Sequence, residues 1–134
     1  MEKVYQELLE EAKKVSKNTY SPYSNFPVGA CVLYESGNKY VGCNVENASY
    51  GLTVCAERSA ISAAITQGEK TKIKAVAIYS PKQAKCMPCG ACRQCINEFA
   101  CENEKTKIIL EGDDSELLIF DLEEIFPSGF KFQK

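Results

Sequence analysis

Histidine is absent from this chain of 134 residues. Its absence excludes Cys–His and Ser–His catalytic pairs and any zinc site with an imidazole ligand. No apolar stretch approaches the roughly 20 residues that a membrane-spanning helix needs. The first ten residues also lack the basic segment and apolar run of a signal peptide. We therefore expect a cytoplasmic protein with no membrane partner.

Neither sign of charge predominates in the chain. Lysine and arginine number 16, aspartate and glutamate 18, and the net charge is −2. Surfaces that bind nucleic acid usually carry clustered basic residues, whereas the lysines here are scattered. We therefore expect a small-molecule substrate and no nucleic-acid partner. The length and the 45% hydrophobic content are those of one globular domain, which we assign to residues 1–134.

The eight cysteines are the most informative residues that are present. In the cytoplasm they indicate metal binding or packing more than disulfides. Two short segments concentrate them with a carboxylate: Cys55-Ala56-Glu57-Arg58 and Pro88-Cys89-Gly90-Ala91-Cys92. Three thiolates suit zinc and leave one coordination position open for water, as in catalytic zinc sites. A glutamate two residues after a ligand can reach that water and move its proton.

Both cysteine segments are predicted to begin helices. Pro88 fits the first turn of a helix, where its missing N–H is not needed. Cys89 and Cys92 would then lie three residues apart on one helical face. The alanine-rich run 55–65 predicts a second helix with Cys55 at its start. The partial positive charge of helix N-termini favours thiolates, so both segments are suited to one metal.

Hydrophobic periodicity predicts the remaining elements. Helices are expected at 2–17, 55–65 and 88–101, and strands at 28–35, 39–43, 73–80, 106–111 and 115–120. A polar loop is expected at 44–54. Only three residues separate the last two strands, which must therefore pair as an antiparallel hairpin. The order of elements predicts a three-layer α/β/α domain with a five-stranded mixed sheet, and ligand sites in such sheets lie at strand ends where helices begin.

Four stretches carry a resemblance to a known family: SPYSNFPVGA (21–30), NVENASYGLTVCAER (44–58), PCGACRQ (88–94) and IFPSGF (125–130). Over nearly its whole length the chain resembles the small cytidine deaminases of pyrimidine salvage. The Cys-Ala-Glu and Pro-Cys-x-x-Cys pair is typical of the zinc nucleoside deaminases in general. The resemblance implies hydrolytic deamination of cytidine and deoxycytidine to uridine and deoxyuridine, with release of ammonia. It also implies the cytidine deaminase-like fold.

The resemblance further implies one Zn²⁺ per subunit, bound by Cys55, Cys89 and Cys92. In the family, the glutamate at the position of Glu57 transfers protons between water, the pyrimidine ring and the departing amino group. The arginine at the position of Arg58 hydrogen-bonds the ligand thiolates and offsets their negative charge.

Substrate contacts are implied at five further positions. In the family, residues matching Asn44 and Glu46 bind the ribose 3′-hydroxyl, and an aromatic matching Phe26 packs against the pyrimidine. The backbone near Ala56 would bind the edge of the base. The aromatic matching Phe130 enters the active site of a neighbouring subunit, so a homotetramer with active sites at subunit contacts is expected.

Three alternatives remain at the level of sequence. Cys86, Cys89, Cys92 and Cys95 form an unbroken C-x-x-C-x-x-C-x-x-C run, which resembles the start of an iron–sulfur motif. The same four thiolates could instead form a structural zinc module, which would leave no position for water. The third alternative is a deaminase of the same superfamily that acts on an aminonucleoside antibiotic.

Overall fold

The computed structural model describes residues 2–132 and is built on one five-stranded sheet. The strands lie in the order β2-β1-β3-β4-β5. Their bounds are β1 Gly29–Tyr34, β2 Lys39–Cys43, β3 Ile73–Tyr79, β4 Lys107–Glu111 and β5 Leu117–Asp121. Strands β3 and β4 are parallel, and every other neighbouring pair is antiparallel. The mixed sheet and the final antiparallel hairpin are therefore confirmed.

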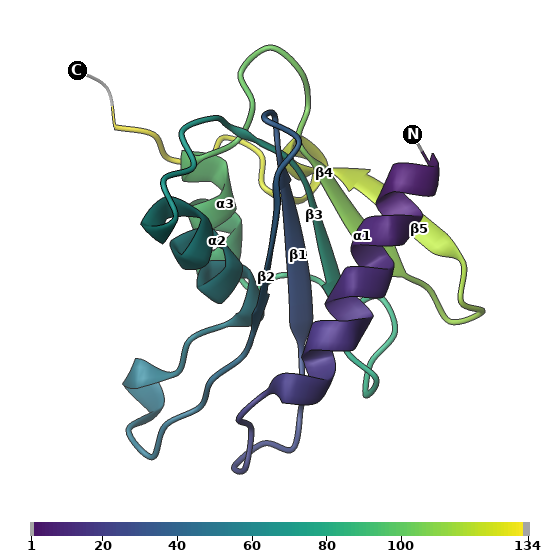
Figure 1. Ribbon diagram of the computed structural model, residues 1–134, viewed down its shortest axis with the longest axis vertical. Coiled ribbons are helices and arrows are strands. Elements are labelled where there is room, and N and C mark those ends of the chain that lie inside the picture. Colours follow the sequence, from purple (N-terminus) through teal and green to yellow (C-terminus); the bar gives the residue numbers. More distant parts are fainter. Residues whose placement is uncertain (1, 133–134) are drawn as a thin grey trace.

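Helices cover both faces of this sheet, which confirms the three-layer prediction (Figure 1). Helix α1 (Glu2–Val15) crosses one face, whereas α2 (Ala56–Thr66) and α3 (Gly90–Glu98) lie together on the other. A short fourth helix, α4 (Leu122–Ile125), follows β5 directly. Among residues 2–132, no helix is both long and apolar enough to span a bilayer.

The two faces of the sheet form separate cores, because side chains alternate along each strand. On the α1 face, buried side chains of the sheet pack against α1; they include Cys31, Leu33, Ala75, Ala77 and Ile109. On the opposite face, the alternate residues pack against α2 and α3; they include Val32, Tyr34, Val76, Ile78, Ile108 and Leu110. Strand β1 is buried along its whole length, as expected for a strand with neighbours on both sides and helices on both faces.

Helix ends are where the prediction from sequence was wrong. Pro88 is buried and precedes α3, which begins at Gly90 with Cys89 as its N-cap, not inside the first turn. Helix α3 also ends at Glu98, before the predicted end at Cys101. Similarly, Cys55 caps α2 and is not its first helical residue. These helix ends therefore lie between one and three residues from their predicted positions, because local propensity does not determine where a helix begins or ends.

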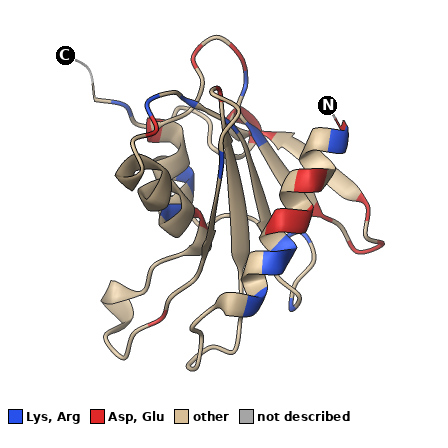
Figure 2. Ribbon diagram, in the orientation of Figure 1, with Lys and Arg blue, Asp and Glu red and all other residues tan. Residues whose placement is uncertain are grey.

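The segment 44–54 has more order than the predicted loop. Val45 pairs with Tyr20 on one side and with Val54 on the other, and a 3₁₀ turn spans Tyr50–Leu52. The pairing with Val54 brings Asn44 and Glu46 alongside the residues that precede α2. Glu46 is the one charged residue between Asn44 and Val54, and this segment is correspondingly drawn almost entirely in tan in Figure 2.

Candidate active site

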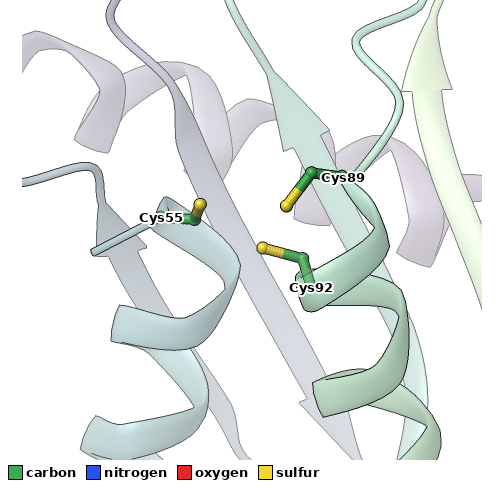
Figure 3. A group of neighbouring side chains, drawn as sticks. All are labelled: Cys55, Cys89 and Cys92. Atoms are coloured by element: carbon green, nitrogen blue, oxygen red, sulfur yellow. The ribbon is translucent and has the colours of Figure 1, made fainter. Parts of the chain in front are cut away.

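Three cysteine sulfurs converge where α2 and α3 begin. The Sγ atoms of Cys55, Cys89 and Cys92 all lie within 4.8 Å of one another, and Figure 3 shows the three side chains pointing toward one point. Cys55 and Cys89 both occupy N-cap positions with extended backbone, and neither makes a side-chain cap hydrogen bond. Cys92 lies on the first turn of α3 and is fully buried. The sequence prediction of two helix starts directed at one metal is thus confirmed.

The donor set fits zinc. Thiolates are soft ligands, and three of them leave one tetrahedral position for another group. Within residues 2–132, this is the only group of three or more cysteine, aspartate or glutamate side chains close enough to share a metal. Cys86 and Cys95 are instead half-buried against the core of the α2–α3 face, and burial raises the pKa of both thiols. The four-cysteine alternatives therefore find no support in the fold.

Arg58 stabilises the thiolate form of the cluster. Its Nη2 atom donates a hydrogen bond to Cys55 Sγ at 3.3 Å. The pKa of Cys55 is lowered, first by hydrogen bonding from Cys92 and then by Arg58. The pKa of Arg58 is raised in return by its hydrogen bond to Cys55. The Nε atom of Arg58 is buried without a hydrogen-bond partner among residues 2–132, so the guanidinium keeps one buried N–H group that could donate a further hydrogen bond.

Glu57 lies on the same helical turn, and its side chain is 4% exposed. Burial raises the pKa of its carboxyl to about 7, with a smaller contribution from the neighbouring Cys55 thiolate. A carboxyl with a pKa near the working pH can both accept and release a proton. This combination of burial and titration near neutrality is typical of catalytic carboxyls.

Asn44 is buried and holds the segment that contains Phe26. Its Oδ1 atom accepts a hydrogen bond from the Val28 backbone N–H at 2.9 Å, and its Nδ2 atom donates to the Phe26 carbonyl at 2.9 Å. An asparagine amide has two N–H groups and two acceptor lone pairs, so one of each remains for another partner. The family resemblance implied only that Asn44 binds the substrate. Its hydrogen bonds to the backbone show that it also holds the 26–28 segment in place.

Glu46 holds the same segment from its other end. Its Oε1 atom accepts hydrogen bonds from the backbone N–H groups of Tyr23 and Ser24 at 2.9 and 3.2 Å, and its Oε2 atom accepts one from the Ser24 hydroxyl. These bonds lower the pKa of Glu46, the Ser24 hydroxyl contributing most. Asn44, Glu46 and the half-buried Phe26 therefore form one structural unit beside the start of α2.

Phe130 is the predicted site residue that lies away from this unit. Its side chain is 70% exposed. Its carbonyl, however, accepts hydrogen bonds from two side-chain amides on α3: Gln94 Nε2 at 2.9 Å and Asn97 Nδ2 at 3.3 Å. The backbone of the tail is thus held on the helix that carries Cys92, while the ring projects into solvent.

Arg93 is a contributor that the sequence left without a role. Its Nε atom donates to the Pro88 carbonyl at 2.7 Å, and its Nη1 atom donates to the Ile125 carbonyl. These bonds tie the turn before Cys89 to the end of α4. The signal was present in the PCGACRQ stretch, but nothing local in the sequence indicates that Ile125 lies nearby.

Comparisons with known proteins agree with this geometry. The sequence model of the cytidine and deoxycytidylate deaminase zinc-binding region matches residues 2–107. A cytidine deaminase of Sporosarcina psychrophila is 42% identical over 119 residues, covering 87% of this chain and 86% of the relative. One of Mycoplasma genitalium is 38% identical over 125 residues, covering 92% and 93%.

Solved structures give the same result. The crystal structure of cytidine deaminase from Burkholderia pseudomallei superposes with a TM-score of 0.83 at 35% identity, covering 93% of this chain and 98% of that one. The enzyme from Mycobacterium tuberculosis gives a TM-score of 0.80 at 32% identity, covering 96% and 98%. With its three converged cysteine sulfurs, its buried Glu57 and these relatives, the chain belongs to the cytidine deaminase family, and its cluster of Cys55, Cys89 and Cys92 suits one zinc ion per subunit.

Proposed function

We propose that the protein catalyses the hydrolytic deamination of cytidine and deoxycytidine to uridine and deoxyuridine, with release of ammonia, in pyrimidine salvage. The observation that carries this proposal is the convergence of three cysteine sulfurs beside a buried glutamate. The names of the relatives narrow the substrate to cytidine, and they do not favour the antibiotic alternative.

Glu57 is the proposed proton carrier. Bound zinc supplies Lewis acidity, which makes water acidic enough to act as a nucleophile at neutral pH. Glu57 accepts a proton from that water and delivers it to ring N3, which makes C4 open to attack. After the water oxygen has bonded to C4, Glu57 moves the remaining proton of the new C4 hydroxyl to the amino group, so that the C4–N bond breaks, ammonia leaves and the carbonyl of uridine forms. One carboxyl can perform each transfer because its pKa lies near 7.

Arg58 is proposed to balance the charge of the zinc site. Three thiolates on a dication leave a net charge of −1, which weakens the metal as a Lewis acid. The hydrogen bond from Arg58 to Cys55 withdraws electron density from one thiolate. This contact supports the role that the family resemblance assigned to Arg58.

Binding of the nucleoside is proposed to involve the unit formed by Asn44, Glu46 and Phe26. A carboxylate has about four acceptor positions, and three hydrogen bonds to Glu46 leave one for a ribose hydroxyl. Asn44 likewise keeps one donor and one acceptor. Phe26 would pack against the pyrimidine, and the backbone at Ala56 would bind the edge of the base.

We also propose a homotetramer in which Phe130 enters the site of a neighbouring subunit. A 70% exposed phenylalanine whose carbonyl is fixed is suited to pack against another surface. A patch of exposed apolar side chains in the 20–54 region offers such a surface; its members are Tyr20, Tyr23, Val45, Tyr50, Leu52 and Val54. Apolar and aromatic groups of this kind are typical of subunit interfaces.

The chain is further proposed to act as one domain, residues 1–134, in the cytoplasm, on a free nucleoside. Basic and acidic residues are intermixed along the ribbon in Figure 2, which does not favour a nucleic-acid partner. All eight cysteines are free of disulfide bonds, as expected for a protein in a reducing compartment.

An ultraviolet assay with zinc determination on the same sample tests the activity. Cytidine and deoxycytidine should be deaminated by protein containing one zinc per chain, whereas cytosine, adenosine and deoxycytidylate should not. Turnover of deoxycytidylate in preference to both nucleosides would overturn the proposed substrate. Turnover without bound metal would overturn the proposed mechanism.

Subunit exchange tests the role of Phe130. Chains carrying Glu57→Ala are mixed with chains carrying Phe130→Ala after dissociation and reassembly. Mixed sites that combine Glu57 of one chain with Phe130 of the other should bind substrate more tightly than the Phe130→Ala protein alone. If substrate affinity does not recover although exchange is proven, Phe130 does not enter the neighbouring site. If light scattering shows a monomer, the proposed tetramer is wrong.

A further inference from the structure

Gly42 lies on β2, opposite Ala30 of β1, where the edge of the sheet meets α2. A Cβ atom placed on Gly42 would lie 2.4 Å from the backbone N of Ala60 and 2.6 Å from the carbonyl O of Ala56. It would also lie 2.9 Å from the carbonyl C of Ser59. All three are backbone atoms, which cannot rotate away as the end of a side chain can.

The conformation of Gly42 does not itself require glycine. The glycines with positive φ are Gly37 and Gly68 among the described residues, and Gly42 is not one of them. An alanine at position 42 would therefore meet no strain within its own backbone. What excludes a side chain is the close approach of α2 alone.

The helical turn against Gly42 is the one that carries the chemistry. Ala56 and Ala60 stand in the i and i+4 relation of an α-helical hydrogen bond, and the two residues after Ala56 are Glu57 and Arg58. Cys55 caps this same turn. Cys89 and Cys92, by contrast, lie at the start of α3, Cys89 as its N-cap and Cys92 in its first turn, and this start is held separately by the bonds from Arg93.

We propose that Gly42 is a positioning residue for the zinc site. The missing side chain lets the first turn of α2 lie directly on β2, and this contact sets the distance of Cys55 and Glu57 from Cys89 and Cys92. Gly42 touches no ligand and acts through α2. The residues around Gly42 in the sequence do not distinguish it from a glycine that is required by a turn.

The expected displacement follows from the overlap. Moving an atom from 2.4 Å to an ordinary contact requires a shift of about 1 Å, since unstrained carbon contacts are about 3.5 Å. Functional sites must be held within about 0.5 Å of their working geometry, and zinc–sulfur bonds are only about 2.3 Å long. A shift of this size should weaken zinc binding by roughly 10–100-fold, as changes around metal ligands do.

Gly29 provides a matched control. A Cβ atom there would lie 2.0 Å from the carbonyl O of Ala12 and 2.8 Å from the backbone N of Ser16. Its overlap is at least as severe and is also with backbone, but it is with α1 and the residue after it, on the opposite face of the sheet (Figure 1). Gly29→Ala should therefore destabilise the fold without moving α2.

Zinc affinity is measured for Gly42→Ala and Gly29→Ala by competition with a chromophoric chelator, and apo stability by denaturant unfolding. Gly42→Ala should bind zinc roughly 10–100-fold more weakly than the parent, and Gly29→Ala within about threefold of it. With zinc saturating, Gly42→Ala should also lose kcat more than it raises KM, because Glu57 moves with the turn. Equal zinc affinity in the two variants would overturn the proposal.

A second pair of variants covers the case in which Gly42→Ala does not fold. Ala60 and Ala64 are both fully buried on α2, in the core of the same face. Ala60→Val adds bulk at the turn that faces Gly42, and Ala64→Val adds it one turn farther from Cys55. The first should weaken zinc binding at least tenfold more than the second; similar losses would overturn the proposal.

The inference rests on the zinc site of the proposed deaminase, but not on its substrate. Zinc affinity is measured without any nucleoside. If the parent protein binds zinc normally but does not deaminate cytidine, the proposed function is overturned. The role of Gly42 is still decided by the zinc affinities of the variants.

Discussion

Replacing the cysteines at positions 86, 89, 92 and 95 with alanine, one at a time, separates an open three-thiolate site from a closed four-thiolate one. The fold places two of these cysteines in the sulfur cluster with Cys55 and the other two against the core. The variants should therefore fall into two pairs that differ in zinc affinity, although the four residues follow one regular spacing in the sequence.

The size of the difference can be estimated. Structural zinc sites with four ligands bind with about 10–16 kcal/mol, or on the order of 3 kcal/mol for each ligand. Loss of one thiolate should thus weaken zinc binding by about 100-fold or more, since each 1.4 kcal/mol is about tenfold. Cys89→Ala and Cys92→Ala should show this loss. For Cys86→Ala and Cys95→Ala we expect unchanged zinc and a loss of about 1 kcal/mol in the free energy of unfolding.

The assay is zinc titration against a chelating dye, with unfolding followed by circular dichroism in the absence of metal. Unfolding of the apo proteins is the control, because it reports packing without ligation. If Cys86→Ala or Cys95→Ala weakens zinc binding as much as Cys89→Ala does, the open-site reasoning is refuted and a four-thiolate centre takes its place.

Three further changes test single side chains. Glu57→Gln should retain zinc and fold but lose about 10²–10⁴ in turnover, measured by ultraviolet assay on metal-replete protein; near-normal turnover would contradict its role. Arg58→Gln should lower activity at saturating zinc by roughly 10–100-fold, and an unchanged rate would make the contact with Cys55 structural only. Glu69→Gln should destabilise the protein near neutral pH, because Glu69 accepts hydrogen bonds from Ser36, Asn38, Tyr40 and Thr71. These bonds, the one from the Thr71 side chain most of all, lower the pKa of Glu69 from 4.5 to about 2. Because the pKa of Glu69 is lower in the folded state, the difference in unfolding free energy between the parent and Glu69→Gln should be full above pH 4.5 and should shrink as the pH falls toward 2. Denaturant unfolding across that range measures this difference. A difference that does not change with pH would contradict a stabilising role for the Glu69 carboxylate.

The sequence predicted features that depend on neighbouring residues. The final hairpin followed from a connection too short for a crossover, and the metal ligands followed from cysteine spacing with Glu57 nearby. Each of these inferences uses residues within one or two adjacent elements.

Features made by distant residues were missed. Glu69 follows a glycine at the end of a helix, where a glutamate is usually solvated, yet it is 7% exposed and accepts hydrogen bonds from the hairpin at 36–40 as well as from Thr71. The start of α3 was misplaced because proline suits both the first turn and the residues before it. The parallel pairing of β3 with β4 likewise depends on the whole sheet and not on either strand.

Helix α3 joins events that are separated in time during synthesis. Its first turn completes the set of zinc ligands at Cys92, whereas the tail that Gln94 and Asn97 hold emerges only at the end of translation. The metal ligands are therefore all present in a nascent chain that still lacks Phe130. The order of synthesis therefore allows zinc loading to precede docking of the tail.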